Sequence, residues 1–217
     1  MDPTDGLRRV NPGSNNPMTG LKFSRTEVRH ILIAVAVLSL AFTIMLYRGG
    51  SRLDSDVTMS IIKLFAVSVC LVTCSFLLHE LGHKYVAQSY GAWSEFRMYP
   101  AGLLMALVFS LLGFLFAAPG AVYIRGNITQ EQNGKISLAG PAVNFIISAF
   151  AIVMCLTTGG VTSQIMFQLA WLNAFLGLFN MIPIPPLDGS KIVQWSIPAF
   201  IITAIIGGLE LGFLWFS

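Results

Sequence analysis

Long apolar segments alternate with short polar stretches along almost the whole of this chain. A helix needs roughly 20 consecutive apolar residues to cross the hydrocarbon core of a bilayer. The pattern predicts transmembrane helices at residues 31–47, 57–90, 136–156, 165–182 and 197–216. We therefore predict an all-α polytopic membrane protein with about five to six transmembrane helices.

One apolar segment, Leu103–Ala118, is shorter than this; it contains Gly113 and is followed by Pro119-Gly120. Its length is ambiguous between a tilted span and a re-entrant segment. The charged and aromatic stretch before it, Gly91–Pro100, is typical of an interfacial turn. After it, Ala121–Thr129 combines β-branched and aromatic residues with a Gly-Asn turn signal, which predicts a short β-hairpin.

The composition is that of a membrane protein. Of the 217 residues, 55% are hydrophobic and 11% are charged, against roughly 25% charged in soluble domains. The thirteen Lys and Arg residues are spread along the chain, so no basic cluster predicts a nucleic-acid partner. All three cysteines fall in apolar segments, which favours packing over a disulfide framework. The expected surroundings are the lipid bilayer.

Residues 1–20 differ from the rest of the chain, because they are rich in Pro, Gly and Asn and contain few apolar residues. This composition predicts a disordered leader or tag. We therefore expect a single transmembrane domain at residues 21–217, without a separate soluble domain.

Two histidines and a glutamate stand at the end of the second predicted span, in the sequence His79-Glu80-Leu81-Gly82-His83. On a helix both imidazoles lie on one face and can ligate one zinc ion, with the intervening glutamate as general base. Ionisable residues in an apolar segment are costly and are functional candidates by default. The spacing therefore predicts a zinc site inside the membrane.

A catalytic zinc needs a third protein ligand and an open position for water. The candidates within apolar sequence are His30, Glu210 and Asp188. We favour Asp188, because the three prolines in residues 183–186 prevent a helix there and offer the aspartate from irregular backbone. Gly189 leaves room for a close approach to a metal. The alternative is an Asp-Gly turn at the membrane surface.

Topology limits which residues can share a site. With a cytoplasmic amino terminus, the second span delivers His83 to the cytoplasmic side. Asp188 returns to that side only if Leu103–Ala118 is re-entrant; a full crossing would place it at the opposite face. The same choice gathers basic residues on one face, as the positive-inside bias requires. These residues are Lys22, Arg25, Arg29, Lys84, Arg97, Arg125, Lys135 and Lys191.

Three motifs together resemble the site-2 protease family of intramembrane zinc metalloproteases. They are His-Glu-Leu-Gly-His at residues 79–83, Gly140-Pro141-x-x-Asn144, and Asn180-x-x-Pro183-x-x-Pro186-x-Asp188-Gly189. The similarity covers a core at residues 57–191 and is that of a minimal form without a PDZ insertion.

This resemblance implies roles for individual residues. Zinc would be held by His79, His83 and Asp188, and Glu80 would activate water. Asn144 and Asn180 would help to position the substrate or stabilise the oxyanion. From the residues alone, Asn144 is also consistent with an interhelical hydrogen bond. For Asn180 the alternative is capping of the turn before the prolines.

The resemblance also implies that an unwound substrate pairs with the strand region at residues 122–125. We expect one catalytic zinc and hydrolysis of a peptide bond in or near a transmembrane helix of a protein substrate. We expect a multi-pass membrane location with the active site toward the cytoplasmic side. The alternatives are a membrane zinc transporter or sensor, which would use the same ligands, and a catalytically silent homologue.

Overall fold

Helices make up most of the described chain. The computed structural model describes residues 21–51, 53–114 and 118–216, so the predicted leader at residues 1–20 lies outside the described part. In chain order the elements are α1 (Arg25–Arg48), α2 (Val57–Val72), the π-helix η1 (Thr73–Leu77), α3 (Leu78–Ser89), β1 (Trp93–Met98), α4 (Pro100–Leu111), β2 (Gly120–Arg125), α5 (Gln130–Thr157), α6 (Gly160–Asn180), α7 (Asp188–Trp195) and α8 (Ile197–Phe216).

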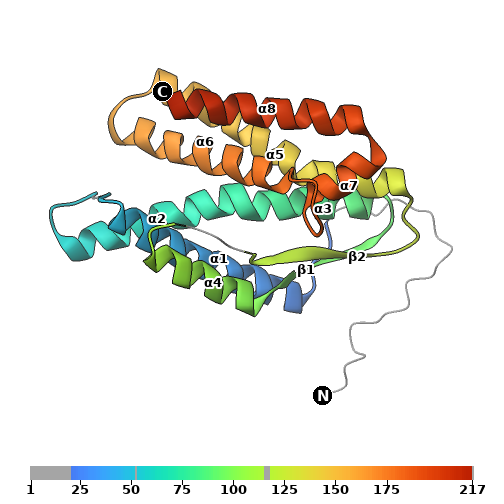
Figure 1. Ribbon diagram of the computed structural model, residues 1–217. Coiled ribbons are helices and arrows are strands. Elements are labelled where there is room, and N and C mark those ends of the chain that lie inside the picture. The colour runs from blue at the N-terminus through green and yellow to red at the C-terminus, as the bar shows by residue number, and fades with distance from the viewer. Residues whose placement is uncertain (1–20, 52, 115–117, 217) are drawn as a thin grey trace, which may run out of the picture.

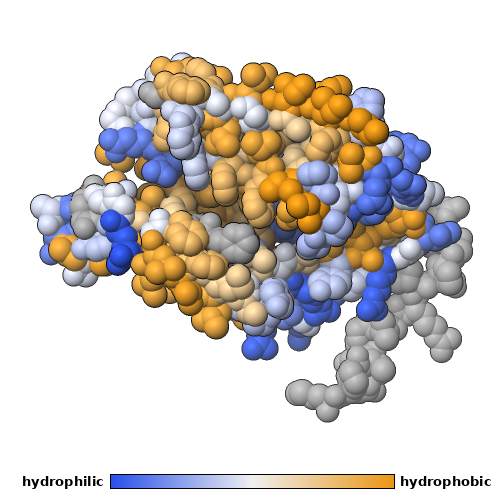
Figure 2. Space-filling view, in the orientation of Figure 1, coloured by the Kyte–Doolittle hydropathy of each residue, from blue (hydrophilic) through white to orange (hydrophobic). Residues whose placement is uncertain are grey.

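Five helical stretches of the described chain are long and apolar enough to cross a membrane. They are α1, the continuous stretch Val57–Ser89 formed by α2, η1 and α3, and the helices α5, α6 and α8. Figure 2 shows hydrophobic side chains over the sides of the helices, with hydrophilic ones mostly toward the left and right ends. The predicted multi-pass, mostly helical membrane fold is therefore confirmed.

The stretch formed by α2, η1 and α3 runs through the middle of the molecule (Figure 1). Helices α1 and α4 and both strands lie on one side of it, and α5, α6, α7 and α8 lie on the other. Asp56 caps the start of α2, because its Oδ1 accepts a hydrogen bond from the Met59 N–H at 2.8 Å. Buried Phe42 of α1, Leu71 of α2, Phe96 of β1 and Leu172 of α6 belong to one apolar core. Residues of the central stretch can therefore contact both layers.

The short apolar segment between the strands returns to the side from which it starts. Helix α4 has 12 residues and is about 18 Å long, whereas a bilayer core is about 30 Å thick. Its flanking strands pair with each other, and the Tyr99 N–H donates to the Pro119 carbonyl at 2.8 Å. Gly102 permits this close return, because a Cβ there would lie 1.9 Å from the Ala118 oxygen. Although residues 115–117 lie outside the described chain, the geometry matches the re-entrant alternative.

The strand pair is present, but one of its strands corrects the sequence interpretation. Strands β1 and β2 are antiparallel, with Trp93 opposite Arg125. Strand β1 occupies the stretch that the charges indicated to be an interfacial turn, and Gly126-Asn127 leads into α5 instead of closing a hairpin. The reason is that the two strands are separated in sequence by α4, so no local turn signal marks their pairing.

The re-entrant path predicts which loops share a membrane face. In a variant without native cysteines, Asn127→Cys and Gln194→Cys should react with an impermeant thiol reagent from the same side. Ser55→Cys, between α1 and α2, should react from the opposite side. All three positions are exposed. Labelling of Asn127→Cys and Gln194→Cys from opposite sides would contradict the fold.

Candidate metal centre

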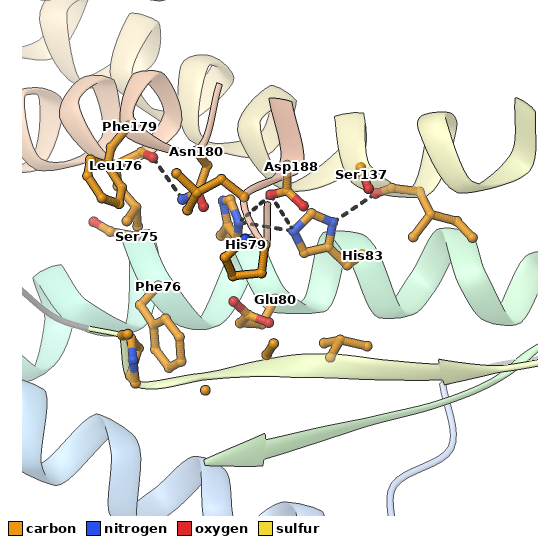
Figure 3. A pocket seen from close by; sticks show the side chains of 18 of the residues that line it. Ser75, Phe76, His79, Glu80, His83, Ser137, Leu176, Phe179, Asn180 and Asp188 are labelled. Atoms are coloured by element: carbon orange, nitrogen blue, oxygen red, sulfur yellow. Dashed lines mark hydrogen bonds and ion pairs between the residues drawn. The ribbon is translucent and has the colours of Figure 1, made fainter. Parts of the chain in front are cut away.

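The two motif histidines lie in the first turns of α3, immediately after the π-helix. Figure 3 shows both imidazoles on the side of α3 that faces α5 and α7. Their Nε2 atoms are 3.0 Å apart, and the rings meet edge to face at 86°. His79 and His83 are both buried, with exposures of 3% and 7%. The i, i+4 spacing therefore directs two nitrogens to one point, as the sequence predicts.

Asp188 supplies a third donor, a carboxylate oxygen, to the same point from α7. Its Oδ2 lies 3.4 Å from Nε2 of His79 and 3.1 Å from Nε2 of His83. Asp188 is the first residue of α7 and not part of irregular backbone, so that part of the sequence interpretation was wrong. Gly189 is required by packing, because a Cβ there would lie 2.1 Å from the Met181 carbonyl oxygen.

The three donors form one compact group. Among the described residues, His79, His83 and Asp188 offer ligand atoms that all lie within 4.8 Å of one another. The other two candidates for the third ligand, His30 and Glu210, do not belong to this group.

Hydrogen bonds to the outer ring nitrogens prepare both histidines to bind a metal. Nδ1 of His79 donates to Oδ1 of Asn144, and Nδ1 of His83 donates to the Ile136 carbonyl at 2.8 Å. Each Nε2 atom therefore presents a lone pair, and these lone pairs converge with a carboxylate oxygen. Such a cluster of acceptors needs a cation.

The spacing of the donors fits zinc. Ligands at about 2.0–2.1 Å in a tetrahedral arrangement are separated by roughly 3.4 Å. The distances between the three donors are 3.0, 3.1 and 3.4 Å. Two imidazoles and one carboxylate also leave one tetrahedral position open, as a catalytic site requires.

The surroundings of Asp188 favour its ionised form. Burial raises the pKa of this carboxyl group, but His83 and His79, when they carry a proton on Nε2 in place of a metal, lower it by more, so that the pKa falls below its usual range. The second oxygen, Oδ1, lies 3.8 Å from Nζ of Lys191. Asp188 therefore offers an anionic oxygen to the donor group.

Helix α5 packs directly against the donors at a glycine. A Cβ at Gly140 would lie 2.4 Å from Nε2 of His83 and 2.7 Å from Cε1 of His79. The glycine of the Gly140-Pro141 pair is therefore required by packing, because any larger residue at Gly140 would displace the imidazoles.

A buried network of amide side chains orients the His79 imidazole through its Nδ1 atom. The Asn144 amide nitrogen donates to Oδ1 of Asn173 at 2.8 Å and to the Ser75 carbonyl at 3.2 Å. Asn173 in turn donates to Oγ of Ser75 at 2.9 Å. Ser75 lies in η1, and π-helical turns commonly occur at functional sites. Asn144 thus makes the interhelical contacts that were the alternative to substrate binding.

Asn173 is a site residue that sequence reasoning did not single out. Its signal was weak, because it was one of two asparagines in a predicted span. The other, Asn180, donates to the Leu176 carbonyl at 2.9 Å and lines the cavity beside the donors.

This cavity separates the donors from the strand β2. Its volume is about 450 Å³, and its walls include Glu80, residues 120–122 of β2 and apolar side chains of α6. Glu80 lies on the strand-facing side of α3 (Figure 3). Its Oε2 is buried without a hydrogen-bond partner among the described residues. An unpartnered carboxylate oxygen therefore lies next to the donor group and the cavity.

Comparison with known proteins identifies relatives over most of the chain. The model described as peptidase family M50 matches residues 156–201. A Methanocaldococcus jannaschii protein named a putative zinc metalloprotease is 38% identical over 91% of this chain and 97% of its own. A second protein of that organism, named a zinc metalloprotease, is 32% identical over 60% of this chain and 34% of its own. A Bacillus subtilis protein named a putative zinc metalloprotease is 30% identical over 71% of this chain and 80% of its own. No solved structure matches the chain significantly.

The packing of α5 predicts a strong effect of one methyl group. Gly140→Ala should lower zinc affinity by at least about tenfold, because its Cβ would overlap the imidazole of His83. Gly208→Ala is the matched control, since a Cβ there has no neighbour within 4 Å. Zinc titration of both purified variants checks this, and wild-type affinity in Gly140→Ala would contradict the packing.

The amide network predicts a separate effect on His79. Asn144→Ala should weaken zinc binding about 10–100-fold, because the imidazole loses the acceptor that sets its orientation. Competition with a chelator of known affinity measures the change. Unchanged zinc affinity, combined with loss of substrate turnover, would instead assign Asn144 to the substrate.

Proposed function

The chain belongs to peptidase family M50, and we propose that it is an intramembrane zinc protease. Its reaction would be hydrolysis of a peptide bond in or near a transmembrane helix of a membrane-protein substrate. The observation that carries this proposal is the convergence of three zinc-type donors beside Oε2 of Glu80, which has no hydrogen-bond partner among the described residues. In this proposal His79, His83 and Asp188 hold one zinc ion.

Glu80 is the general base of the proposed reaction. Bound zinc supplies Lewis acidity, which polarises a peptide carbonyl and acidifies water. Oε2 of Glu80 would accept the proton that water loses and later donate it to the leaving amine nitrogen. Its lack of a hydrogen-bond partner among the described residues supports this role, because the oxygen is free to accept a proton.

The cavity supports a substrate in extended conformation. A peptide bond within a helix is shielded by the hydrogen bonds and side chains of that helix, so a transmembrane substrate must unwind locally. Strand β2 pairs with β1 along one edge, and its residues from Gly120 to Val122 line the cavity. We infer that the unwound substrate adds to β2 as a further strand, which satisfies its exposed backbone groups.

Two further proposals concern the membrane side that the site faces and the role of Asn180. We propose that the site faces the cytoplasmic side, because the basic residues at the metal-centre end follow the positive-inside bias. We also propose that Asn180 contacts the substrate, since it lines the cavity. The partners in this proposal are a transmembrane protein substrate and the lipid bilayer, with no nucleic acid.

The proposed base is tested by a nearly isosteric change. Glu80→Gln should bind one zinc ion per chain as the wild type does, yet lower the rate of cleavage of a reporter transmembrane segment about 10²–10⁴-fold. Mass spectrometry of the peptide products and zinc analysis measure both quantities. Asp188→Ala, assayed in parallel, should instead weaken zinc binding.

Two outcomes would contradict the proposal. Full cleavage activity of Glu80→Gln would exclude the glutamate as the base. Tight zinc binding without cleavage by the wild type, together with zinc flux in liposomes, would support a transporter.

A further inference from the structure

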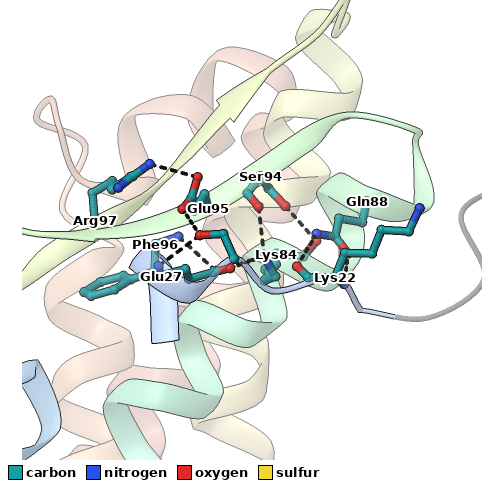
Figure 4. A network of polar contacts seen from close by, with 9 residues as sticks. Lys22, Glu27, Lys84, Gln88, Ser94, Glu95, Phe96 and Arg97 are labelled. Carbon is teal, nitrogen blue, oxygen red and sulfur yellow. Dashed lines mark hydrogen bonds and ion pairs between the residues drawn. The ribbon is translucent and has the colours of Figure 1, made fainter. Parts of the chain in front are cut away.

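A buried ion pair links α1 to the metal-bearing helix α3. Nζ of Lys84 donates to both carboxylate oxygens of Glu27, at 2.8 and 2.9 Å (Figure 4). Glu27 and Lys84 are 0% and 1% exposed. The charge pattern of the sequence places Lys84 among the basic residues of one membrane face, but its buried side chain cannot contribute charge to a surface. Burying two charges is costly, so their geometry needs an explanation.

The same two side chains contact the outer edge of β1. Nζ of Lys84 donates to the Ser94 carbonyl at 2.8 Å, and the Phe96 N–H donates to Oε1 of Glu27 at 3.0 Å. In a strand, the carbonyl of one residue and the N–H of the second residue after it point to the same edge. The opposite edge of β1 pairs with β2. The ion pair therefore supplies the donor and the acceptor that a neighbouring strand would supply.

Further contacts tie the start of α1 to the same place. Oγ of Ser24 donates to Glu95 of β1. Gln88 of α3 exchanges hydrogen bonds with the backbone of Lys22, at 3.0 and 3.2 Å. Figure 4 shows Lys22, Gln88 and Glu95 around the strand and the two helices. The outer edge of β1 is therefore held by α1 and α3 together.

The ion pair has a consequence for the proposed reaction because Lys84 directly follows His83. One turn of α3 thus holds a metal donor and also the strand β1. Strand β1 carries β2, whose residues line the cavity beside Glu80. The distance from the metal centre to the substrate edge of β2 depends on this connection.

We propose that Glu27 and Lys84 are positioning residues that close the outer edge of β1 and set the place of the substrate strand relative to the metal centre. This inference rests on the proposed function. It makes the edge of β2 opposite β1 the place where a transmembrane substrate pairs, and it assigns the choice of scissile bond partly to residues that touch neither substrate nor metal.

The test replaces the pair by apolar side chains of similar size. Glu27→Leu/Lys84→Met fills the same space and avoids an unpaired buried charge, but it removes both contacts to the strand edge. Glu27→Gln/Lys84→Met is a milder variant, because it also leaves no unpaired buried charge but keeps an acceptor for the Phe96 N–H. Lys63→Met is the matched control, because Lys63 is 48% exposed and pairs with Asp54 2.7 Å away in the loop between α1 and α2.

Four quantities are measured on the purified proteins. They are zinc content, hydrogen exchange of the β1 amides, kcat/KM for a reporter transmembrane segment, and the bonds cut, identified by mass spectrometry. The Glu27→Leu/Lys84→Met variant should retain one zinc ion per chain, exchange the Phe96 amide faster, lose about 10²-fold in kcat/KM and cut at additional bonds. Glu27→Gln/Lys84→Met should show smaller changes of the same kind, and Lys63→Met none.

A purely structural role would lower the yield of folded protein without changing how the folded fraction cuts. Wild-type kcat/KM and an unchanged cut site in the zinc-loaded Glu27→Leu/Lys84→Met variant would therefore overturn the inference. If that variant does not fold, the same result in Glu27→Gln/Lys84→Met overturns it. Absence of cleavage by the wild type would contradict the proposed function, while hydrogen exchange would still test the closure of the strand edge.

Discussion

The structure depends on bringing three electron-pair donors from two helices, α3 and α7, to one point inside a membrane protein. Two imidazole nitrogens of α3 lie 3.0 Å apart, and the carboxylate oxygen comes from α7, which follows α6 in the chain. Without a cation these groups repel one another and are poorly solvated. The close packing at Gly140 and Gly189 and the return of α4 all allow this convergence.

Two polar networks stabilise the site from opposite sides of α3. Asn144, Asn173 and Ser75 hold the imidazole of His79, whereas Glu27 and Lys84 hold the strand pair. Buried polar groups are tolerated only when their hydrogen bonds are satisfied, and both networks are largely satisfied by protein atoms. Oε2 of Glu80 is a contrasting case, because it is buried and has no partner within the described chain. Satisfied hydrogen bonds thus distinguish the groups that stabilise the site from the carboxylate oxygen that is proposed to react.

Sequence patterns predicted those features that depend on local spacing or on membrane thickness. The spans, the histidine pair and the return of α4 follow from segment length, the helical repeat and charge asymmetry. Features that depend on distant partners were missed. Strand β1 carries charges that are typical of an interfacial turn, and its partner lies beyond α4. Lys84 was interpreted as a basic residue of one face, because no local pattern reveals that Glu27 neutralises it. The role of Asn173 follows only from its hydrogen bond with Asn144, which lies on another helix.

In the proposed centre, one zinc ion joins α3 to α7 through two imidazoles and one carboxylate. X-ray absorption at the zinc edge of the purified protein tests this claim. We expect one zinc ion per chain, bound by two imidazole nitrogens at about 2.0–2.1 Å and by oxygen ligands at about 2.0–2.2 Å. Loss of one oxygen ligand in Asp188→Ala would identify the carboxylate. Sulfur ligands at about 2.3 Å, or a spectrum that Asp188→Ala leaves unchanged, would contradict the claim.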